Sequence, residues 1–352
     1  MSEDSNNIFG RRLNQARLMN GITMEELGKS VRPAVSRQAI NKYEKGQTMP
    51  DSRMLIAFGR ALGVKPDYFF RPFTVTVDRI MFQKNSRLPA KTVAAIRERV
   101  REELERYLEI EELCGSECGF CLKKHVAADG LQACEAAKAV RLELGLGMDG
   151  ISNVIEVLED NGIKVIETDG DCMFGGLSGY ANDNIPLIVI NRNLSTENKR
   201  LTLLHELAHL ILDFGDVADP DTMENICDLF AIELLLPAEV LKTRLGHVRH
   251  DISLEELSDI QKQYGASIDT IMIALRNAGV ISSRRYDGYL KKKRCFPDFN
   301  ALVERSMKMP ETSGRFVRMV YRAVADELIS FSKAAVLLNT TVDAVKSRLQ
   351  LV

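Results

Sequence analysis

Residues 201–214, LTLLHELAHLILDF, are apolar at most positions, yet they hold two histidines and an internal glutamate. Apolar residues on nearly every face are typical of a helix that is buried in a domain core. Positions i and i+4 of a helix lie on one face, one turn apart, so His205 and His209 face the same way. Burying two imidazoles and the carboxyl group of Glu206 is unfavourable unless a partner compensates them. The segment therefore predicts a core helix that contributes to a metal site.

The spacing His-Glu-x-x-His is typical of zinc peptidases, in which both imidazoles bind one Zn²⁺ and the glutamate reaches a water molecule. We expect His205 and His209 to be zinc ligands. We expect Glu206 to be the catalytic base, which takes a proton from the water that attacks the peptide bond. A purely structural zinc site has no need of this glutamate, so the motif favours an enzyme.

A catalytic zinc takes a third protein ligand from outside this helix. Residues 223–237, MENICDLFAIELLLP, predict a second apolar helix that Pro237 ends. Glu224 and Asp228 are four residues apart and share a face of it. We expect Glu224 to be the third ligand and Asp228 to accept a hydrogen bond from a ligand histidine. Three other acidic residues remain open as the third ligand: Asp213, Asp216 and Glu233.

Six segments carry a resemblance to a known family: AAKAVRLELGL, FGGLSGY, IPLIVINRN, KRLTLLHELAHLIL, ENICDLFAIELLLP and YGASIDTIMIALRNAGVIS. Through them residues 135–282 resemble the ImmA/IrrE family of zinc metallopeptidases. The family pattern after the metal helix begins here at Glu224, with Cys227 in place of a small alanine. The resemblance implies a zincin-like domain with Glu224 as the third ligand. It also implies a protein substrate, an XRE-type repressor or an antitoxin.

The N-terminal 73 residues predict five short helices separated by tight turns, an arrangement typical of helix-turn-helix domains. Thr23 and Glu26 have the spacing of a capping box at the start of the second helix. Through TMEEL, VSRQAINKYEKG and the trailing MP, residues 8–70 resemble the Cro/phage-repressor (XRE) family. Met24 stands where that family often has glutamine, and the turn RPAVS is about two residues longer than usual.

The third predicted helix, RQAINKYEKG, has side chains suited to the major groove on its outward face. Residues 1–73 carry 12 Lys and Arg against seven Asp and Glu, a net charge of +5, although the whole chain has −2. A basic module on an acidic body favours contact with a polyanion. We expect double-stranded DNA to be bound through Ser36, Arg37, Gln38, Asn41 and Lys42. A helical module that binds protein is the alternative.

These patterns predict a mainly α chain with a small β-sheet, an α+β fold. We expect a DNA-binding domain at 1–73, a linker and long connecting helix at 74–133, a zinc peptidase domain at 134–282 and a helical region at 283–352. The connecting helix is either solvated or a contact between two copies in a homodimer. Residues 186–190 predict a strand whose edge could hold an extended substrate, and FGGLSGYANDN predicts a bend.

Cys114, Cys118 and Cys121, with His125 and Cys134 downstream, raise the question of a second, structural zinc site. The spacing includes a single C-x-x-C pair and does not match a zinc ribbon, so ordinary thiols are the favoured interpretation. At the C-terminal end, YDGYLKKKRC predicts a basic exposed patch. SFSKAAVLLNTTVDAVKSRL is typical of another small helix-turn-helix, to which we assign no DNA contact.

No apolar run approaches the roughly 18 residues needed to cross a bilayer, and the N-terminal residues are acidic and polar. Seven cysteines, an odd number, argue against a secreted disulfide framework. We therefore expect a cytoplasmic protein without a membrane partner. Two functions remain open. One is a DNA-associated zinc endopeptidase that acts on a repressor or antitoxin, and the other is a regulator whose zinc domain is a non-catalytic sensor or oligomerisation module.

Overall fold

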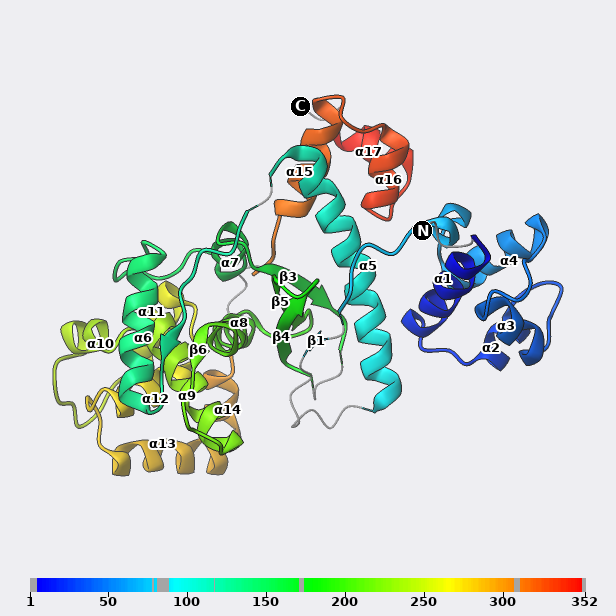
Figure 1. The fold of residues 1–352 in the computed structure, drawn as a ribbon. Helices are drawn as coiled ribbons and strands as arrows, with labels where there is room; N and C mark the ends of the chain where they lie inside the picture. Colours follow the sequence, from blue (N-terminus) through cyan, green and yellow to red (C-terminus); the bar gives the residue numbers. More distant parts are fainter. Residues whose placement is uncertain are drawn as a thin grey trace. The chain divides into compact units, whose positions relative to one another are not determined.

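The computed structural model describes residues 5–77, 79–80, 89–116, 118–170, 174–306 and 311–349. The chain is predominantly helical with a few short strands, which confirms the expected α+β class (Figure 1). It divides into two compact units. The first comprises residues 1–110 with 181–183, and the second comprises 111–180 with 184–352. None of the described helices combines the length and the apolar character needed to cross a membrane.

The first unit begins with a cluster of short helices. These are α1 (Ser5–Met19), α2 (Met24–Ser30), α3 (Arg37–Glu44), α4 (Ser52–Leu62) and the 3-10 helix η1 (Pro66–Phe70). The last of the five predicted helices is therefore a 3-10 helix. The predicted capping box is present, since Thr23 and Glu26 bond to each other's backbone N–H groups. The core of the cluster contains Phe9, Leu13, Leu27, Ile40 and Phe58, each fully buried.

Helix α5 (Ala90–Cys114) belongs to the first unit up to Ile110. Its contact with α1 is polar and enclosed. Arg12, only 1% exposed, bonds to Glu105 Oε2 and to Gln15 Oε1, each at 2.7 Å. The N-terminal helices are thus fastened to α5 by a buried ion pair. Residues 78 and 81–88 of the expected linker lie outside the described residues, and β1 spans Arg79–Ile80 between them.

The second unit contains the strands β3 (Lys164–Thr168), β4 (Gly176–Ala181) and β5 (Ile185–Asn191). Their order is β4–β5–β3, with β3 parallel to β5. The expectation that residues 186–190 offer a free edge to substrate is wrong, because β5 pairs with a neighbour on each side. Strand order depends on pairing between distant segments, which the local apolar pattern does not encode.

The expected bend at FGGLSGYANDN is also wrong over Gly176–Ala181, which form β4. Small residues such as Gly176 and Ser178 have low strand propensity, so the local sequence favours a turn. Pairing with β5 overrides that preference. The buried face of β4 lies against the helix that follows the sheet, and small side chains permit this close approach.

The helices of this unit before residue 283 are α6 (Gly130–Glu143), α7 (Val154–Asp160), α8 (Thr196–Ile211), α9 (Pro220–Leu235), α10 (Ala238–Leu245), α11 (Leu254–Tyr264) and α12 (Ile268–Asn277). Helix α8 packs against β5 and α9, and α9 packs against α6. A small parallel sheet joins β2 (His125–Val126) to β6 (Leu212–Asp213). The two helices predicted to carry the metal site, α8 and α9, therefore form the centre of this unit.

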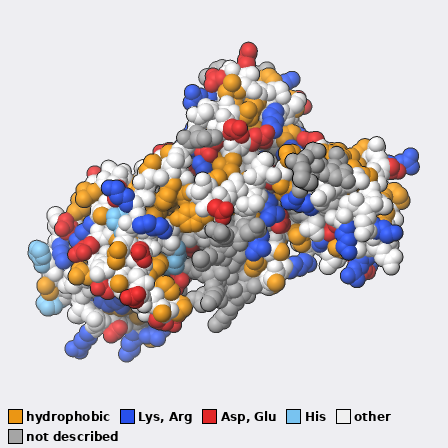
Figure 2. Space-filling view, in the orientation of Figure 1, with side chains coloured by type: hydrophobic (Ala, Val, Ile, Leu, Met, Phe, Trp, Pro, Cys, Tyr) orange, Lys and Arg blue, Asp and Glu red, His pale blue; other side chains and the backbone are white. Residues whose placement is uncertain are grey.

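The C-terminal region contains α13 (Ser283–Cys295), α14 (Pro297–Val303), α15 (Arg315–Ala325), α16 (Phe331–Leu337) and α17 (Val342–Leu349). Helix α16 packs against both α15 and α17. The basic patch predicted at YDGYLKKKRC lies on α13, where Arg284, Lys291, Lys292 and Arg294 are exposed. Figure 2 shows Lys and Arg side chains at the lower left, where α13 lies.

Candidate metal centre and nucleic-acid interface

The candidate metal centre lies between α8 and α9, and each helix begins at a defined cap. Ser195 accepts a hydrogen bond from the backbone N–H of Asn198 (3.3 Å) at the start of α8. Asp219 accepts one from the N–H of Thr222 (3.0 Å) at the start of α9, with Pro220 in the first turn. Such caps satisfy backbone donors that have no partner within the helix.

The side chains of His205, His209 and Glu224 converge. His205 Nε2 lies 3.2 Å from His209 Nε2 and 3.1 Å from Glu224 Oε2, and His209 Nε2 lies 3.6 Å from Glu224 Oε1. Tetrahedral ligands with bonds of about 2.0–2.1 Å stand about 3.3 Å apart. The three donor groups thus have the mutual spacing of ligands around one tetrahedral metal ion, and the residues fit such an ion.

Asp228 lies beside the other nitrogen of His205. Its Oδ1 is 2.8 Å from His205 Nδ1, and its side chain is 62% exposed. A carboxylate at Nδ1 favours the tautomer that carries its proton there, which leaves Nε2 free to bind a metal. The position matches the role expected for Asp228 from the sequence.

The electrostatics of this cluster favour positive charge. Burial lowers the pKa of His205, but hydrogen bonds to Asp228 and Glu224 outweigh it and raise the pKa to about 10. Hydrogen bonds from His205 and His209 lower the pKa of Glu224 to about 2. The Glu224 carboxylate therefore faces the imidazoles in its charged form, and the site is suited to a cation.

Cys227 is a further sulfur ligand in reach. Its Sγ lies 3.7 Å from His209 Nδ1, and one ligand atom each from His205, His209 and Cys227 lie within 4.8 Å of one another. The thiol is fully buried, and burial, followed by the charge of Glu224, raises its pKa. A thiol that resists ionisation is a poor metal ligand. Cys227 also faces Nδ1 of His209, whereas both Nε2 atoms face Glu224, so the geometry favours the carboxylate.

Glu206, the residue after His205 on α8, points toward β4. It is 3% exposed, burial raises its pKa, and the Ser178 hydroxyl donates a hydrogen bond of 2.8 Å to its Oε2. Gly176 makes room for this contact, because a Cβ there would lie 3.3 Å from Glu206 Cγ and 3.0 Å from Thr202 Cγ2. The carboxyl group is thus held in one orientation in a largely dry environment.

The alternative third ligands occupy other surroundings. Asp213 accepts a hydrogen bond from the N–H of Gly215 (3.1 Å), and Asp216 is exposed. Glu233 lies nine residues beyond Glu224 on α9 and accepts a hydrogen bond from the N–H of Ala238 (3.2 Å). Among the described residues, the carboxylate that contacts both Nε2 atoms is that of Glu224.

The cysteine cluster has separate partners. The thiols of Cys114, Cys118 and Cys121 contact the carbonyl oxygens of Met319 (3.7 Å), Asp160 (3.2 Å) and Gly119 (3.1 Å), respectively. All three are free thiols. Across the part of the chain that the structure describes, the group suited to a metal ion is the one at His205, and it includes none of them.

The candidate nucleic-acid interface lies on α3 in the first unit. Ser36 is the N-cap, and its hydroxyl accepts a hydrogen bond from the N–H of Ala39 (3.2 Å). Ile40 is fully buried and holds the helix to its neighbours. The predicted DNA-contacting side chains lie on the other face: Arg37, Gln38 and Lys42 are exposed, and Asn41 is half-buried. Helical periodicity alone was sufficient to separate these two faces.

Ser178 is the residue that sequence reasoning missed. The pattern FGGLSGY supports the family resemblance but predicts no role for its serine. The contact with Glu206 joins β4 to α8, 28 residues apart. A hydrogen bond between distant segments leaves no pattern in the local sequence. A polar residue in a buried strand nevertheless indicates that its side chain has a hydrogen-bond partner.

Two comparisons with known families agree with this arrangement. Residues 158–276 match the peptidase M78 family, described as an IrrE N-terminal-like domain, and residues 13–69 match a helix-turn-helix family. The first match covers β3, β4, β5, α8 and α9, and the second covers α3. No curated protein matches the chain. The chain joins an XRE-type helix-turn-helix domain to an IrrE/ImmA-like domain of a metallopeptidase family.

Proposed function

We propose that this protein is a DNA-associated zinc endopeptidase that controls transcription by cleaving a regulatory protein. The observation that carries the proposal is the convergence of His205, His209 and Glu224 beside a buried Glu206. Two imidazoles and one carboxylate are a donor set that zinc peptidases use, and they leave one coordination position open. The match to a peptidase family supports the same assignment.

In this proposal His205, His209 and Glu224 hold the zinc ion, and Asp228 keeps His205 in the correct tautomer. When bound, zinc supplies a Lewis acid that polarises the peptide carbonyl and lowers the pKa of a water molecule. Cys227 is assigned a packing role beside His209 because burial opposes its ionisation. Soft thiolate ligands would favour a closed structural site instead.

Glu206 performs the proton transfers. It accepts a proton from the attacking water and then delivers it to the nitrogen of the leaving amine. Burial raises its pKa, the direction that favours proton donation in the second transfer. Ser178 orients the carboxyl group, so only one of its oxygens is left to face the substrate.

The helix-turn-helix domain binds the peptidase to a specific DNA sequence. We assign base contacts to Arg37, Gln38 and Asn41, and phosphate contacts to Lys42 and the N-terminus of α3 at Ser36. The protein substrate we assign is an XRE-type repressor or an antitoxin, which follows from the resemblance of the peptidase domain. A protease carried to an operator meets the repressors bound there at high local concentration.

The proposal is tested by incubating the zinc-loaded full-length protein with each helix-turn-helix repressor and antitoxin encoded beside it. Mass spectrometry of the products is expected to show one pair of fragments that sum to the intact substrate. A metal chelator should abolish them and added zinc should restore them. Fragments that persist in the chelator, or an absence of cleavage with every neighbouring protein, would contradict the proposal.

A further inference from the structure

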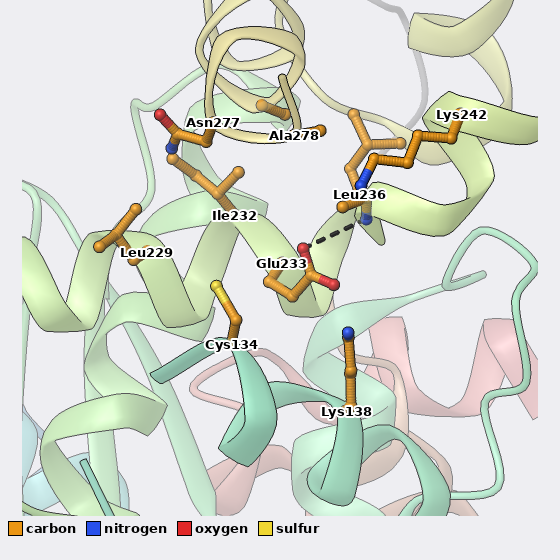
Figure 3. A pocket seen from close by; sticks show the side chains of 11 residues that line it. Cys134, Lys138, Leu229, Ile232, Glu233, Leu236, Lys242, Asn277 and Ala278 are labelled. Atoms are coloured by element: carbon orange, nitrogen blue, oxygen red, sulfur yellow. Dashed lines mark hydrogen bonds between the residues drawn. The ribbon is translucent and has the colours of Figure 1, made fainter. Parts of the chain in front are cut away.

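A cavity lies among α6, α9, α10 and α12, outside the candidate metal centre (Figure 3). Its volume is about 150 Å³. Glu233, which lines it, lies nine residues after Glu224 on α9, about 13 Å farther along the helix axis. The polar lining consists of Cys134, Lys138, Glu233, Lys242 and Asn277. The apolar lining consists of Leu229, Ile232, Leu236, Ala238, Ala274 and Ala278.

Glu233 is the unusual member of this lining. It is only 7% exposed, and its Oε2 accepts a hydrogen bond from the N–H of Ala238 (3.2 Å). Its Oε1 is buried and has no hydrogen-bond partner among the residues that the structure describes. A buried carboxyl oxygen without a partner is costly, and such atoms are rare in folded proteins. The cavity therefore contains an acceptor that a ligand with N–H groups would satisfy.

Two lysines, Lys138 and Lys242, line other sides of the cavity. Lys138 comes from α6 and Lys242 from α10, and both act on Glu233 electrostatically. Figure 3 shows these lysines extending toward the space beside Glu233 from different helices. Neither supplies a hydrogen bond to Oε1. The two ammonium groups can pair with the carboxylate of a ligand, and the buried carboxylate can pair with its ammonium group. The cavity is therefore complementary to a zwitterion.

The remaining walls fix the size and polarity of the ligand. Leu229 and Ile232 come from α9 and Leu236 is its C-cap, while Ala274 comes from α12 and Ala278 is its C-cap. An apolar cavity of about 150 Å³ holds one benzene molecule in another protein. The α-carbon, amino nitrogen and side-chain carbons of leucine together match benzene in number of heavy atoms. These six atoms match the cavity volume, which leaves the carboxylate of the ligand for the lysines.

We propose that this cavity binds a free α-amino acid with a short, branched apolar side chain, with its ammonium group on Glu233 and its carboxylate between Lys138 and Lys242. An amine without a carboxylate leaves both lysines without a partner from the ligand. A carboxylic acid without an amine leaves Glu233 Oε1 unsatisfied. Of these three kinds of ligand, the zwitterion is the one that pairs with both Glu233 and the two lysines. Ala274 and Ala278 leave room for its side chain.

The cavity also shares α9 with Glu224 and Asp228, so its occupant contacts the helix that carries two groups of the candidate metal centre. A regulatory effect on cleavage rests on the function proposed above. Binding itself does not, and calorimetry measures it whether or not the protein cleaves a substrate. Failure of the amino-acid site and failure of the peptidase assignment are therefore separate results.

The first test is isothermal titration calorimetry of the full-length protein with L-leucine, 3-methylbutylamine and 4-methylpentanoic acid. The second compound is leucine without its carboxylate, and the third is leucine without its amine. We expect one leucine per chain, with the amine and the acid each bound at least about tenfold more weakly, since each loses a charge-assisted contact. Absence of leucine binding, or equal affinity for the acid, would overturn the proposal.

Variants identify the groups responsible. Glu233→Gln should weaken leucine binding about 10- to 100-fold, and Ala278→Leu should abolish it by filling the cavity. Glu239→Gln is the matched control, because this exposed glutamate lies on α10 but does not line the cavity. Thermal unfolding checks that each variant is folded. Leucine binding by Glu233→Gln with the parent's affinity would contradict the assignment.

A chemical reporter within the cavity gives an independent measurement. Cys134 lines the cavity, whereas Cys295 is exposed at the end of α13. Leucine should slow alkylation of Cys134 at least about fivefold by closing access to it, and it should leave Cys295 unchanged, as measured by peptide mass spectrometry. Equal rates at Cys134 with and without saturating leucine would place any bound leucine elsewhere and overturn the proposal.

Discussion

Ser178 donates a hydrogen bond of 2.8 Å to Oε2 of Glu206, which joins β4 to the helix of the candidate metal centre. The serine stands in a glycine-rich strand, and Gly176 brings that strand close enough for the contact. A general base needs its carboxyl group held in a single orientation, and a neutral hydroxyl can do so without neutralising its charge. We therefore treat Ser178 as a positioning residue for Glu206.

Ser178→Ala should lower kcat about tenfold, with little change in KM, because the orientation of Glu206 is lost while substrate contacts remain. Zinc content should stay at one per chain. Ser178→Thr retains the hydroxyl and should recover part of the rate. The measurement is steady-state cleavage of the identified substrate, together with metal analysis. An alanine variant with the parent's kcat would remove Ser178 from the mechanism.

The third ligand is tested by metal content. Glu224→Ala should lower bound zinc well below one per chain, because it removes the carboxylate that faces both Nε2 atoms. Asp228→Asn should retain zinc but bind it about 10- to 100-fold more weakly, because the hydrogen bond at His205 Nδ1 changes. Asp213→Ala is the matched control. If Glu224→Ala kept full zinc while Asp213→Ala lost it, the third ligand would be Asp213 and not Glu224.

Much of this site could be predicted from the sequence because helical periodicity is local. The faces of α8 and α9 follow from the spacing of His205, His209, Glu224 and Asp228 alone. The position of β5 could not be predicted, since a continuous apolar strand looks the same at a sheet edge and at its centre. Ser178 was missed for the related reason that its partner is distant in sequence.

DNA recognition is tested on the full-length protein, because Arg12 in α1 pairs with Glu105 in α5 and a fragment of residues 1–73 would break that buried pair. Gln38→Ala or Asn41→Ala should cost about 1–3 kcal/mol at the cognate operator and relax base preference there. Lys42→Ala should weaken binding to all sequences alike and reduce the salt dependence. Fluorescence anisotropy at several salt concentrations measures both. Salt-independent binding would favour the protein-interaction alternative.

The pH dependence of stability is tested at Glu233, whose pKa is raised by burial. Lys138 on α6 and Lys242 on α10 lower that pKa, and Glu239 on α10 raises it. A raised pKa in the folded state means that protonation stabilises the fold at low pH, and this contribution is lost as pH rises through the folded value. Glu233→Gln has no carboxyl group to ionise at this position, so the variant does not lose this stability as pH rises.

The unfolding temperature of Glu233→Gln relative to the parent should therefore be higher at pH 8 than at pH 5. Differential scanning calorimetry at the two pH values makes the comparison. Glu255→Gln, an exposed glutamate on α11, is the control and should track the parent at both. If the unfolding temperature of Glu233→Gln minus that of the parent decreases from pH 5 to pH 8, the stated direction is wrong.

The central claim is that Glu206 is a catalytic base, and Glu206→Gln tests it most directly. The substitution keeps the size of the side chain and leaves His205, His209 and Glu224 intact, so zinc should remain at one per chain. Operator binding should be unchanged, because the helix-turn-helix lies in the other unit. The cleavage rate should fall about 100- to 10,000-fold, the usual loss for a general base. A Glu206→Gln protein that cleaves at the parent's rate, or regulates its target genes as the parent does, would contradict the account.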